Sequence, residues 1–236
     1  MTSFQSSNRA AGQTTIVFDL DGTLVDTAPD LIETLNVVFR SEGLPPVPYN
    51  TARLAIGGGA KRMIVRGLEA EGRTAEPDLV ERLFVQFINY YSAHIADRSQ
   101  PFPGLEVALD NLSARGFTLA VCTNKLEGLS LQLLKALGLT DRFAAICGQD
   151  TFGIQKPNPV ILQRTIELAG GDASRAVMVC DSETDVLTAR AAGIPVIAVD
   201  FGYSDPPVSE FHPDRLISHF DALGDAINAV LRPAHG

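Results

Sequence analysis

The sequence of 236 residues has no tryptophan, only three cysteines and three methionines, and fewer basic than acidic side chains. Its 19 lysines and arginines stand against 28 aspartates and glutamates, which gives a formal charge of −9 at pH 7. Because a nucleic-acid backbone demands a concentrated basic surface, this balance argues against nucleic acid as a partner. It is compatible with a small anionic substrate, which needs only a local cationic pocket.

Long apolar runs and a leader pattern are also absent. The uncharged apolar stretches have the length of strands, short of the roughly 20 residues of a membrane-spanning helix, and no basic-then-apolar signal pattern opens the chain. Cys122, Cys147 and Cys180 are far apart and lie in apolar segments, so we interpret them as small buried residues rather than as a disulfide framework or zinc site. We therefore expect a soluble cytoplasmic protein without a membrane partner.

The pattern of polar and apolar residues changes along the chain. Residues 1–13 are polar and aperiodic, which predicts a flexible N-terminal tail. Residues 27–99 show apolar side chains at helical spacing and no convincing strand, whereas short apolar strands alternate with helices after residue 100. We expect an α/β fold in which a doubly wound, Rossmann-like parallel sheet, formed by 14–26 and 100–236, is interrupted by an all-helical cap domain at 27–99.

Polar residues follow the strands of this predicted core. The first strand, in IVFDLDGT, ends in Asp19 and Asp21; Gly22 then lets the chain turn, and Thr23 can orient Asp21 through a hydrogen bond. In open parallel sheets, ligands bind beyond the carboxyl ends of the strands. The residues that we expect to meet at this edge are Asp19, Asp21, Thr123, Asn124, Lys156, Asp181 and Asp185.

These side chains are suited to phosphoryl transfer. Three close carboxylates repel one another unless a cation lies between them, and Mg²⁺ takes carboxylate and phosphate oxygens as ligands. Lys156 and Thr123 supply a positive charge and a donor for a phosphoryl group. One carboxylate can attack phosphorus while a second moves protons, which gives Asp19 and Asp21 different tasks.

Each motif also has a purely structural interpretation. An Asp-x-Asp-Gly run can be a turn held by its own side chains, and Lys156 before a proline can simply begin a helix. Thr123 with Asn124, and Asp181 with Ser182, can be helix caps. These interpretations do not explain why all four motifs fall at one edge of the sheet.

Taken in order, the motifs DLDGT at 19–23, Thr123, Lys156 with Pro157, and DSETD at 181–185 resemble those of the phosphatase branch of the haloacid dehalogenase superfamily. The resemblance runs from about residue 15 to about residue 231. One departure is Cys180, where the family more often has glycine, and we expect it to alter packing rather than function.

The resemblance implies specific roles. Asp19 would form the phospho-intermediate and bind Mg²⁺, and Asp21 would be the acid and base and give its backbone carbonyl to the metal. Asp181 would be the remaining protein ligand, and Asp185 would support the metal site or Lys156. Because Asp21 is present, a phosphomonoester reaction is favoured over dehalogenation or phosphonate cleavage, and sugar-phosphate mutases remain an alternative.

The resemblance also implies that Thr123 and Lys156 hold the phosphoryl group. We place Thr23 and Asn124 beside them as substrate-binding residues. The bound substrate is then a small phosphomonoester.

The helical insert contains the unusual stretch AIGGGAKRMI. Gly58 and Gly59 with Lys61 and Arg62 can place backbone amides and a cation at a helix N-terminus, where they would bind a second anionic group of the substrate. The alternative is a flexible turn between helices with exposed basic residues.

This stretch, and Gly202 with Tyr203 after the last core strand, resemble phosphoglycolate phosphatases. We therefore expect a Mg²⁺-dependent phosphomonoester hydrolase that uses an aspartyl-phosphate, with 2-phosphoglycolate as the leading substrate. The alternatives are a sugar-phosphate mutase, a pyrophosphatase or nucleotidase of the same superfamily, and a catalytically silent binding protein. The sequence is compatible with a monomer or a homodimer.

Overall fold

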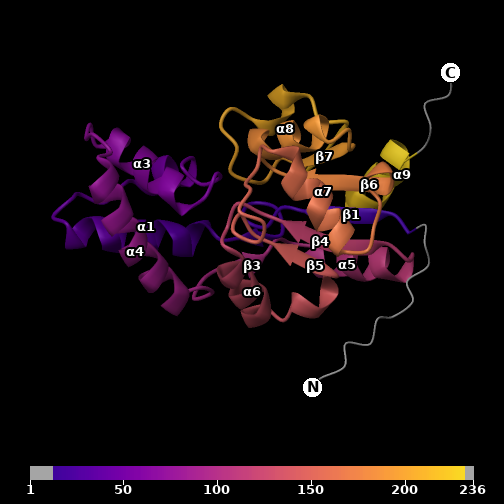
Figure 1. Cartoon of the computed structure of the whole chain (residues 1–236), viewed down its shortest axis with the longest axis horizontal. Coiled ribbons are helices and arrows are strands. Elements are labelled where there is room, and N and C mark those ends of the chain that lie inside the picture. Colours follow the sequence, from indigo (N-terminus) through magenta and orange to yellow (C-terminus); the bar gives the residue numbers. More distant parts are fainter. Residues whose placement is uncertain (1–12, 232–236) are drawn as a thin grey trace.

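The computed structural model describes residues 13–231 and has an α/β core with a helical insertion beside it (Figure 1). The predicted tail at 1–13 lies outside the described residues except for its last residue. In Figure 1 the insertion, drawn in indigo and magenta, projects from one end of the core. The predicted fold class is confirmed. The inserted helices occupy residues 28–93, and the cap boundaries of 27–99 stay a prediction.

The described part of the core is organised by a six-stranded parallel sheet in the order β5-β4-β1-β6-β7-β8. Its central strand pairs on both sides, with Thr15 opposite Thr118 on one side and Ala176 on the other. The chain order diverges from this strand in both directions, which opens a crevice at its carboxyl end. The strands are β1 (Thr15–Phe18), β4 (Thr118–Cys122), β5 (Ala145–Cys147), β6 (Ala176–Cys180), β7 (Val196–Val199) and β8 (Arg215–Ile217).

Helices cover both faces of this sheet. Because successive side chains of a strand point to opposite faces, Ile16 and Phe18 join one apolar cluster and Val17 the other. Helices α5, α6 and α9 pack on the first face, and α7 and α8 on the second. These helices are α5 (Leu105–Ala114), α6 (Glu127–Ala136), α7 (Pro159–Leu168), α8 (Glu183–Ala191) and α9 (Leu223–Leu231).

In the insertion, α1 and α3 both pack against α4, and the short α2 packs against α1 and α3. Gly67 lets α3 approach α1, because a Cβ there would lie 2.9 Å from the Phe39 ring. Asp30 ties the start of α1 to the returning chain, since its carboxylate accepts the backbone N–H groups of Arg98 and Ser99. The inserted helices are α1 (Ala28–Ser41), α2 (Tyr49–Arg53), α3 (Ala60–Ala70) and α4 (Pro77–Ala93).

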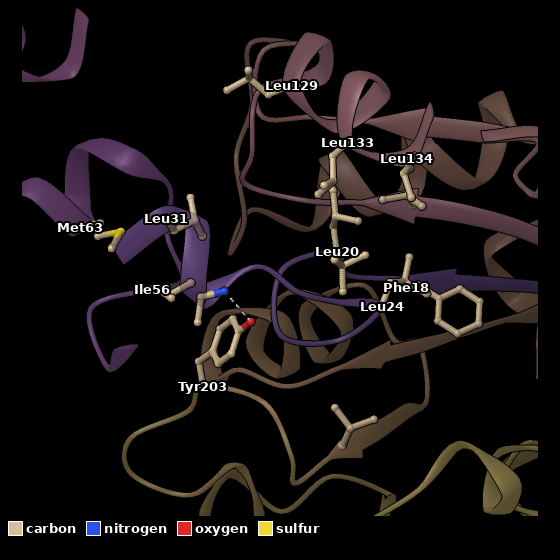
Figure 2. Close-up of a cluster of buried hydrophobic side chains, with 14 of the residues drawn as sticks. Phe18, Leu20, Leu24, Leu31, Ile56, Met63, Leu129, Leu133, Leu134 and Tyr203 are labelled. Atoms are coloured by element: carbon tan, nitrogen blue, oxygen red, sulfur yellow. Dashed lines mark hydrogen bonds between the residues drawn. The ribbon is translucent and has the colours of Figure 1, made fainter. Parts of the chain in front are cut away.

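The two chain segments that enter and leave the insertion are also paired with each other. They form the antiparallel strands β2 (Val25–Asp26) and β3 (Gln100–Pro101). Buried apolar side chains continue from the core through this junction into the insertion (Figure 2). The insertion is therefore joined to the core by packed side chains as well as by two strands. In Figure 2 the continuous cluster includes Phe18, Leu20, Leu24, Leu31, Ile56 and Met63.

Several short elements complete the described chain. β8 and the helices α2 and α9 were not predicted from the sequence. In β8 only Ile217 is buried, whereas Arg215 and Leu216 are exposed, so the strand has no run of apolar residues that could be recognised. No helix among residues 13–231 has the length and apolar character to cross a membrane. The 3₁₀ turns are η1 (Thr140–Arg142), η2 (Ala173–Arg175), η3 (Val208–Phe211) and η4 (Phe220–Ala222).

Candidate active site

A tight turn places the two acids of DLDGT at the edge of the sheet. The Asp19 N–H donates to Val179 O over 3.0 Å, which extends the pairing of β1 with β6 by one residue. Gly22 then adopts a φ of +85°, in the left-handed region that favours glycine, and the chain turns back. Asp19 and Asp21 consequently line the same space beyond the carboxyl end of β1.

Three buried carboxylates meet at this edge. Oxygens of Asp19, Asp181 and Asp185 all lie within 4.8 Å of one another. Asp19 follows β1, whereas Asp181 follows β6 and Asp185 lies in the first turn of α8. Burial, reinforced by the neighbouring carboxylates, raises the pKa of Asp19 to about 7 and that of Asp181 to about 8. The cluster therefore favours either bound protons or a bound cation.

Lys156 supplies part of the missing positive charge. Its Nζ lies 2.9 Å from Asp19 Oδ1 and also donates to Asp185 and to Cys122 O. One ammonium among three ionised carboxylates leaves two negative charges, which a divalent cation would balance. Asp19 Oδ1 accepts no well-aligned hydrogen bond from the residues that the structure describes. This buried, hard-oxygen donor set fits a divalent metal ion.

Asp181 is held in place by its surroundings. Thr23 Oγ1 donates to Asp181 Oδ1 and the Tyr203 N–H donates to Asp181 Oδ2, each over 2.9 Å. A Cβ at Gly22 would lie 2.4 Å from Asp181 Oδ2, and one at Gly202 would lie 2.3 Å from its Cβ. Thr23 was predicted to orient Asp21, but its buried hydroxyl donates to Asp181 instead. Its predicted contact with substrate stays a prediction.

Asn124 has a structural partner at this edge. Its Oδ1 accepts the Lys156 N–H over 2.9 Å, and its Nδ2 donates to Lys156 O over 3.2 Å. Both ends of the amide are therefore engaged with one backbone residue, so Asn124 positions Lys156 where the sequence predicted a substrate contact. Thr123 Oγ1 accepts the Lys125 N–H, which leaves its hydroxyl proton for an anion.

Lys125 is a charged residue of the site that the sequence analysis missed. Its Nζ lies 2.9 and 3.1 Å from the two oxygens of Asp21 and 4.5 Å from the centre of the Tyr91 ring. The Lys125 side chain is only 5% exposed. The second predicted acid is thus paired with a buried cation, and nothing in the local sequence pattern distinguishes this lysine from an exposed one.

Two clefts between the core and the insertion reach Asp19 and Asp21. The first, which we call the apolar cleft, also contains Lys125 and Lys156. The second, which we call the polar cleft, has Arg62 among its charged residues. Apolar side chains that line the first cleft include Leu31, Ile56, Met63, Phe84, Phe87 and Leu129.

The glycine-rich segment of the insertion borders both clefts. Gly57, Gly58 and Gly59 all have positive φ, and a Cβ at Gly59 would lie 3.1 Å from Asn124 O across the cleft. This close approach explains why glycine is needed there. Lys61, by contrast, pairs with Glu81 and is half exposed, outside the lining of either cleft.

The chain matches the haloacid dehalogenase-like hydrolase family over residues 16–199. It belongs to this family. Phosphoglycolate phosphatase of Mesorhizobium japonicum is 52% identical over 208 residues, which cover 88% of this chain and 92% of the relative. The phosphoglycolate phosphatase of Agrobacterium fabrum is 48% identical over 212 residues, covering 89% and 91%.

A solved structure has the same fold as this haloacid dehalogenase-like hydrolase. The crystal structure of a predicted phosphoglycolate phosphatase from Haemophilus somnus aligns with a TM-score of 0.84 at 28% identity. The alignment covers 90% of this chain and 97% of that structure, so it includes the insertion as well as the core. The core and the insertion therefore occur together in a related protein.

Proposed function

We propose that this haloacid dehalogenase-like hydrolase is a Mg²⁺-dependent phosphatase that hydrolyses 2-phosphoglycolate. The observation that carries the proposal is the buried contact of Asp19 with Lys156 inside a cluster of three carboxylates. The near full-length similarity to phosphoglycolate phosphatases supports the choice of substrate. The free, buried cysteines support a reducing, cytoplasmic setting.

In the proposed reaction, Asp19 is the nucleophile. A bond forms between its carboxylate oxygen and phosphorus while the bond from phosphorus to the alkyl oxygen breaks, and Asp21 gives that oxygen a proton. Asp21 then takes a proton from water, whose oxygen attacks phosphorus and releases Asp19 and inorganic phosphate. Lys156 and the Thr123 hydroxyl hold the phosphoryl oxygens, and Asn124 fixes the backbone of Lys156.

Asp19, Asp181 and the backbone carbonyl of Asp21 would hold Mg²⁺. Asp185 supports this site through Lys156, whose ammonium donates a hydrogen bond to the Asp185 carboxylate. When bound, Mg²⁺ neutralises charge on the phosphoryl oxygens. Thr23 and the Tyr203 N–H keep the Asp181 carboxylate in one orientation.

We further propose that the insertion is a cap that closes over the substrate. Gly58 and Gly59 at the N-terminus of α3 border the apolar cleft, and Arg62 adds positive charge at the polar cleft. Excluding water by closure of such a segment favours transfer to the enzyme before hydrolysis. A monomer and a homodimer are both compatible with this role.

Phosphate release from a panel of monoesters tests the function. We expect 2-phosphoglycolate to have a much higher kcat/KM than pyrophosphate, sugar phosphates or nucleotide monophosphates, and chelator to abolish turnover. A flat profile would reject the substrate and keep the phosphatase. Activation by a sugar bisphosphate with little net phosphate release would instead identify a mutase, and no release from any ester would identify a silent binding protein.

A further inference from the structure

The apolar cleft has positive charge at two places. Of the described residues that line it, Lys125 and Lys156 are the ones with a cationic side chain. Lys156 contacts Asp19, Asp185 and Cys122 O, which ties it to the nucleophile and the acidic cluster. Lys125 contacts Asp21 and lies over Tyr91, at the side of the cleft formed by the insertion. The cleft therefore has a second cation in addition to the one beside the nucleophile, and this second cation could bind a second anionic group.

The surroundings of Lys125 are unusual for a lysine that serves only to hold a fold. It follows Thr123 and Asn124 in the loop after β4, and its side chain is buried beside the apolar lining of the cleft. A buried ammonium loses hydration and must be matched by an anion. In this structure the anion is Asp21, whose two oxygens both accept from it. Asp21 has a separate task in the proposed reaction, which requires an oxygen directed at the leaving group.

We propose that Lys125 binds the carboxylate of the substrate, an inference that rests on the proposed function. In 2-phosphoglycolate a single methylene separates the carboxylate from the phosphate ester oxygen, so both charged groups must enter one cleft. When the phosphoryl group lies at Asp19 and Lys156, the carboxylate is brought toward the insertion, where Lys125 is the cation of the apolar lining. The ammonium exchanges Asp21 for the substrate carboxylate, and Asp21 becomes free to face the ester oxygen.

Arg62 and Arg66 of the polar cleft are the competing cations for this role. Arg66 donates to Leu54 O, so Arg62 is the stronger competitor. It lies at the polar cleft, its side chain packs over Gly58, and the residue is exposed. A carboxylate bound there would keep much of its hydration, and ion pairs in water discriminate weakly between ligands. Lys125 lies in a buried, mostly apolar lining, where an uncharged group in place of the carboxylate would leave its charge without the new partner. Discrimination for an anionic substrate is therefore assigned to Lys125.

The test compares two substrates that differ only in this carboxylate. Ethyl phosphate has a methyl group where 2-phosphoglycolate has the carboxylate, and both are hydrolysed at the same phosphorus. We define the preference as the ratio of kcat/KM for 2-phosphoglycolate to kcat/KM for ethyl phosphate. Because both substrates are measured on one preparation with Mg²⁺, this ratio does not depend on the fraction of active protein.

We expect Lys125→Met to lower the preference by about 30-fold or more, because it removes the buried partner of the carboxylate. Lys125→Arg keeps the positive charge and should therefore retain most of the preference for 2-phosphoglycolate. The matched control Arg62→Met should change the preference by less than about threefold, as for an exposed charge. Lys125→Gln repeats the measurement should the methionine variant fail to fold.

Three results would overturn the inference. If Lys125→Met slows both substrates by the same factor, the lysine serves Asp21 and does not recognise the carboxylate. If Arg62→Met removes the preference instead, the second anion binds in the polar cleft. If the wild-type enzyme already shows no preference, the proposed substrate is wrong and the inference fails with it, a result distinguished from the other two before any variant is made.

Discussion

The two sides of the apolar cleft differ in chemistry and in how they are held. On the core side, Asp19 and Lys156 line the cleft and lie in one buried cluster with Asp181 and Asp185. On the insertion side the lining is apolar, from helices that pack on one another, and a single turn of three glycines approaches the core. Lys125 belongs to this side of the cleft because its ammonium lies over Tyr91 of α4, although its backbone is in the core loop after β4. One side can make and break bonds, and the other can only select what enters.

This difference separates reaction from recognition. A change on the core side should affect every substrate alike, since the phosphoryl group is common to all of them. A change on the insertion side should alter the ranking of substrates and leave the reaction itself possible. The predictions below, ordered from the largest effect to the smallest, test whether this separation holds.

Asp19→Asn should reduce turnover of every ester by about 10⁴-fold or more, because the amide cannot serve as the nucleophile. The protein should remain folded, as circular dichroism and the unfolding midpoint would show. If turnover stayed near normal while only the melting temperature changed, the acidic cluster would have a structural role alone. The core side would then have no part in the reaction, and the proposed separation of reaction from recognition would fail.

Gly202→Ala should disturb Asp181 without touching substrate. Its Cβ would lie 2.3 Å from Asp181 Cβ, so the carboxylate or the loop must move, and we expect stability to fall by about 2 kcal/mol and kcat by roughly 10²-fold. A shifted Mg²⁺ titration of activity would locate the damage at the metal site. The control is Gly128→Ala in α6, where nothing lies within 4 Å of the added Cβ and stability should rise by about 0.5 kcal/mol. Equal effects of the two substitutions would contradict the clamp around Asp181.

The stability of the metal-free protein should depend on pH through the core side. The pKa values of Asp19 and Asp181 are raised to about 7 and about 8, above those of an unfolded chain, so the folded state binds these protons more tightly. The resulting stability is fully present below about pH 4 and is lost as pH rises through 7 and 8. In chelator, urea unfolding should show a fall of about 5 kcal/mol between pH 5.5 and 8.5, to which both carboxyl groups contribute, and Mg²⁺ should offset it. Asp181→Asn should flatten this dependence, and an unchanged slope in that variant would exclude Asp181 as its source.

The difference between the core side and the insertion side also explains which features could be predicted from the sequence. Asp19, Thr123 and Asp181 each follow an apolar strand directly, and parallel strands bring their carboxyl ends together, so their meeting could be predicted. Lys156 lies in the loop between β5 and α7 and was predicted from the proline that follows it. The longer helices of the insertion, α1, α3 and α4, were visible in their periodicity, whereas the short α2 was not. The hydrogen-bond partner of Thr23 could not be predicted, because it lies 158 positions away and depends on how the loops pack.

The insertion side was predicted less well for a physical reason. Phe87 and Tyr91 have the same helical spacing whether they fill a core or line a cleft, so periodicity cannot distinguish the two. Lys125 depends on Asp21, 104 positions away, and a lysine after a strand is usually exposed. The Lys61 side chain, in turn, was predicted to face an anion because it follows the glycines, but the direction of α3 turns it toward Glu81.

Tyr203 connects the core with the start of the insertion and gives the smallest expected effect. Its N–H holds Asp181, whereas its hydroxyl donates to Asp26 over 2.6 Å and accepts the Ala28 N–H over 3.0 Å, where the insertion begins (Figure 2). Tyr203→Phe removes only the hydroxyl and should cost about 1 kcal/mol of stability. Tyr49→Phe, at a residue that is 48% exposed, is the control and should be neutral.

The kinetic consequence of Tyr203→Phe decides how separate the two sides are. The backbone contact with Asp181 survives the substitution, so kcat and the Mg²⁺ requirement should stay within about twofold of wild type. The start of α1 loses an anchor, and the less restrained insertion should raise KM for 2-phosphoglycolate about threefold, because ordering it then consumes more of the binding free energy. Steady-state kinetics at several Mg²⁺ concentrations would measure both. A fall in kcat with a changed Mg²⁺ requirement would mean that the junction transmits strain to Asp181, and that recognition and reaction share one rigid support.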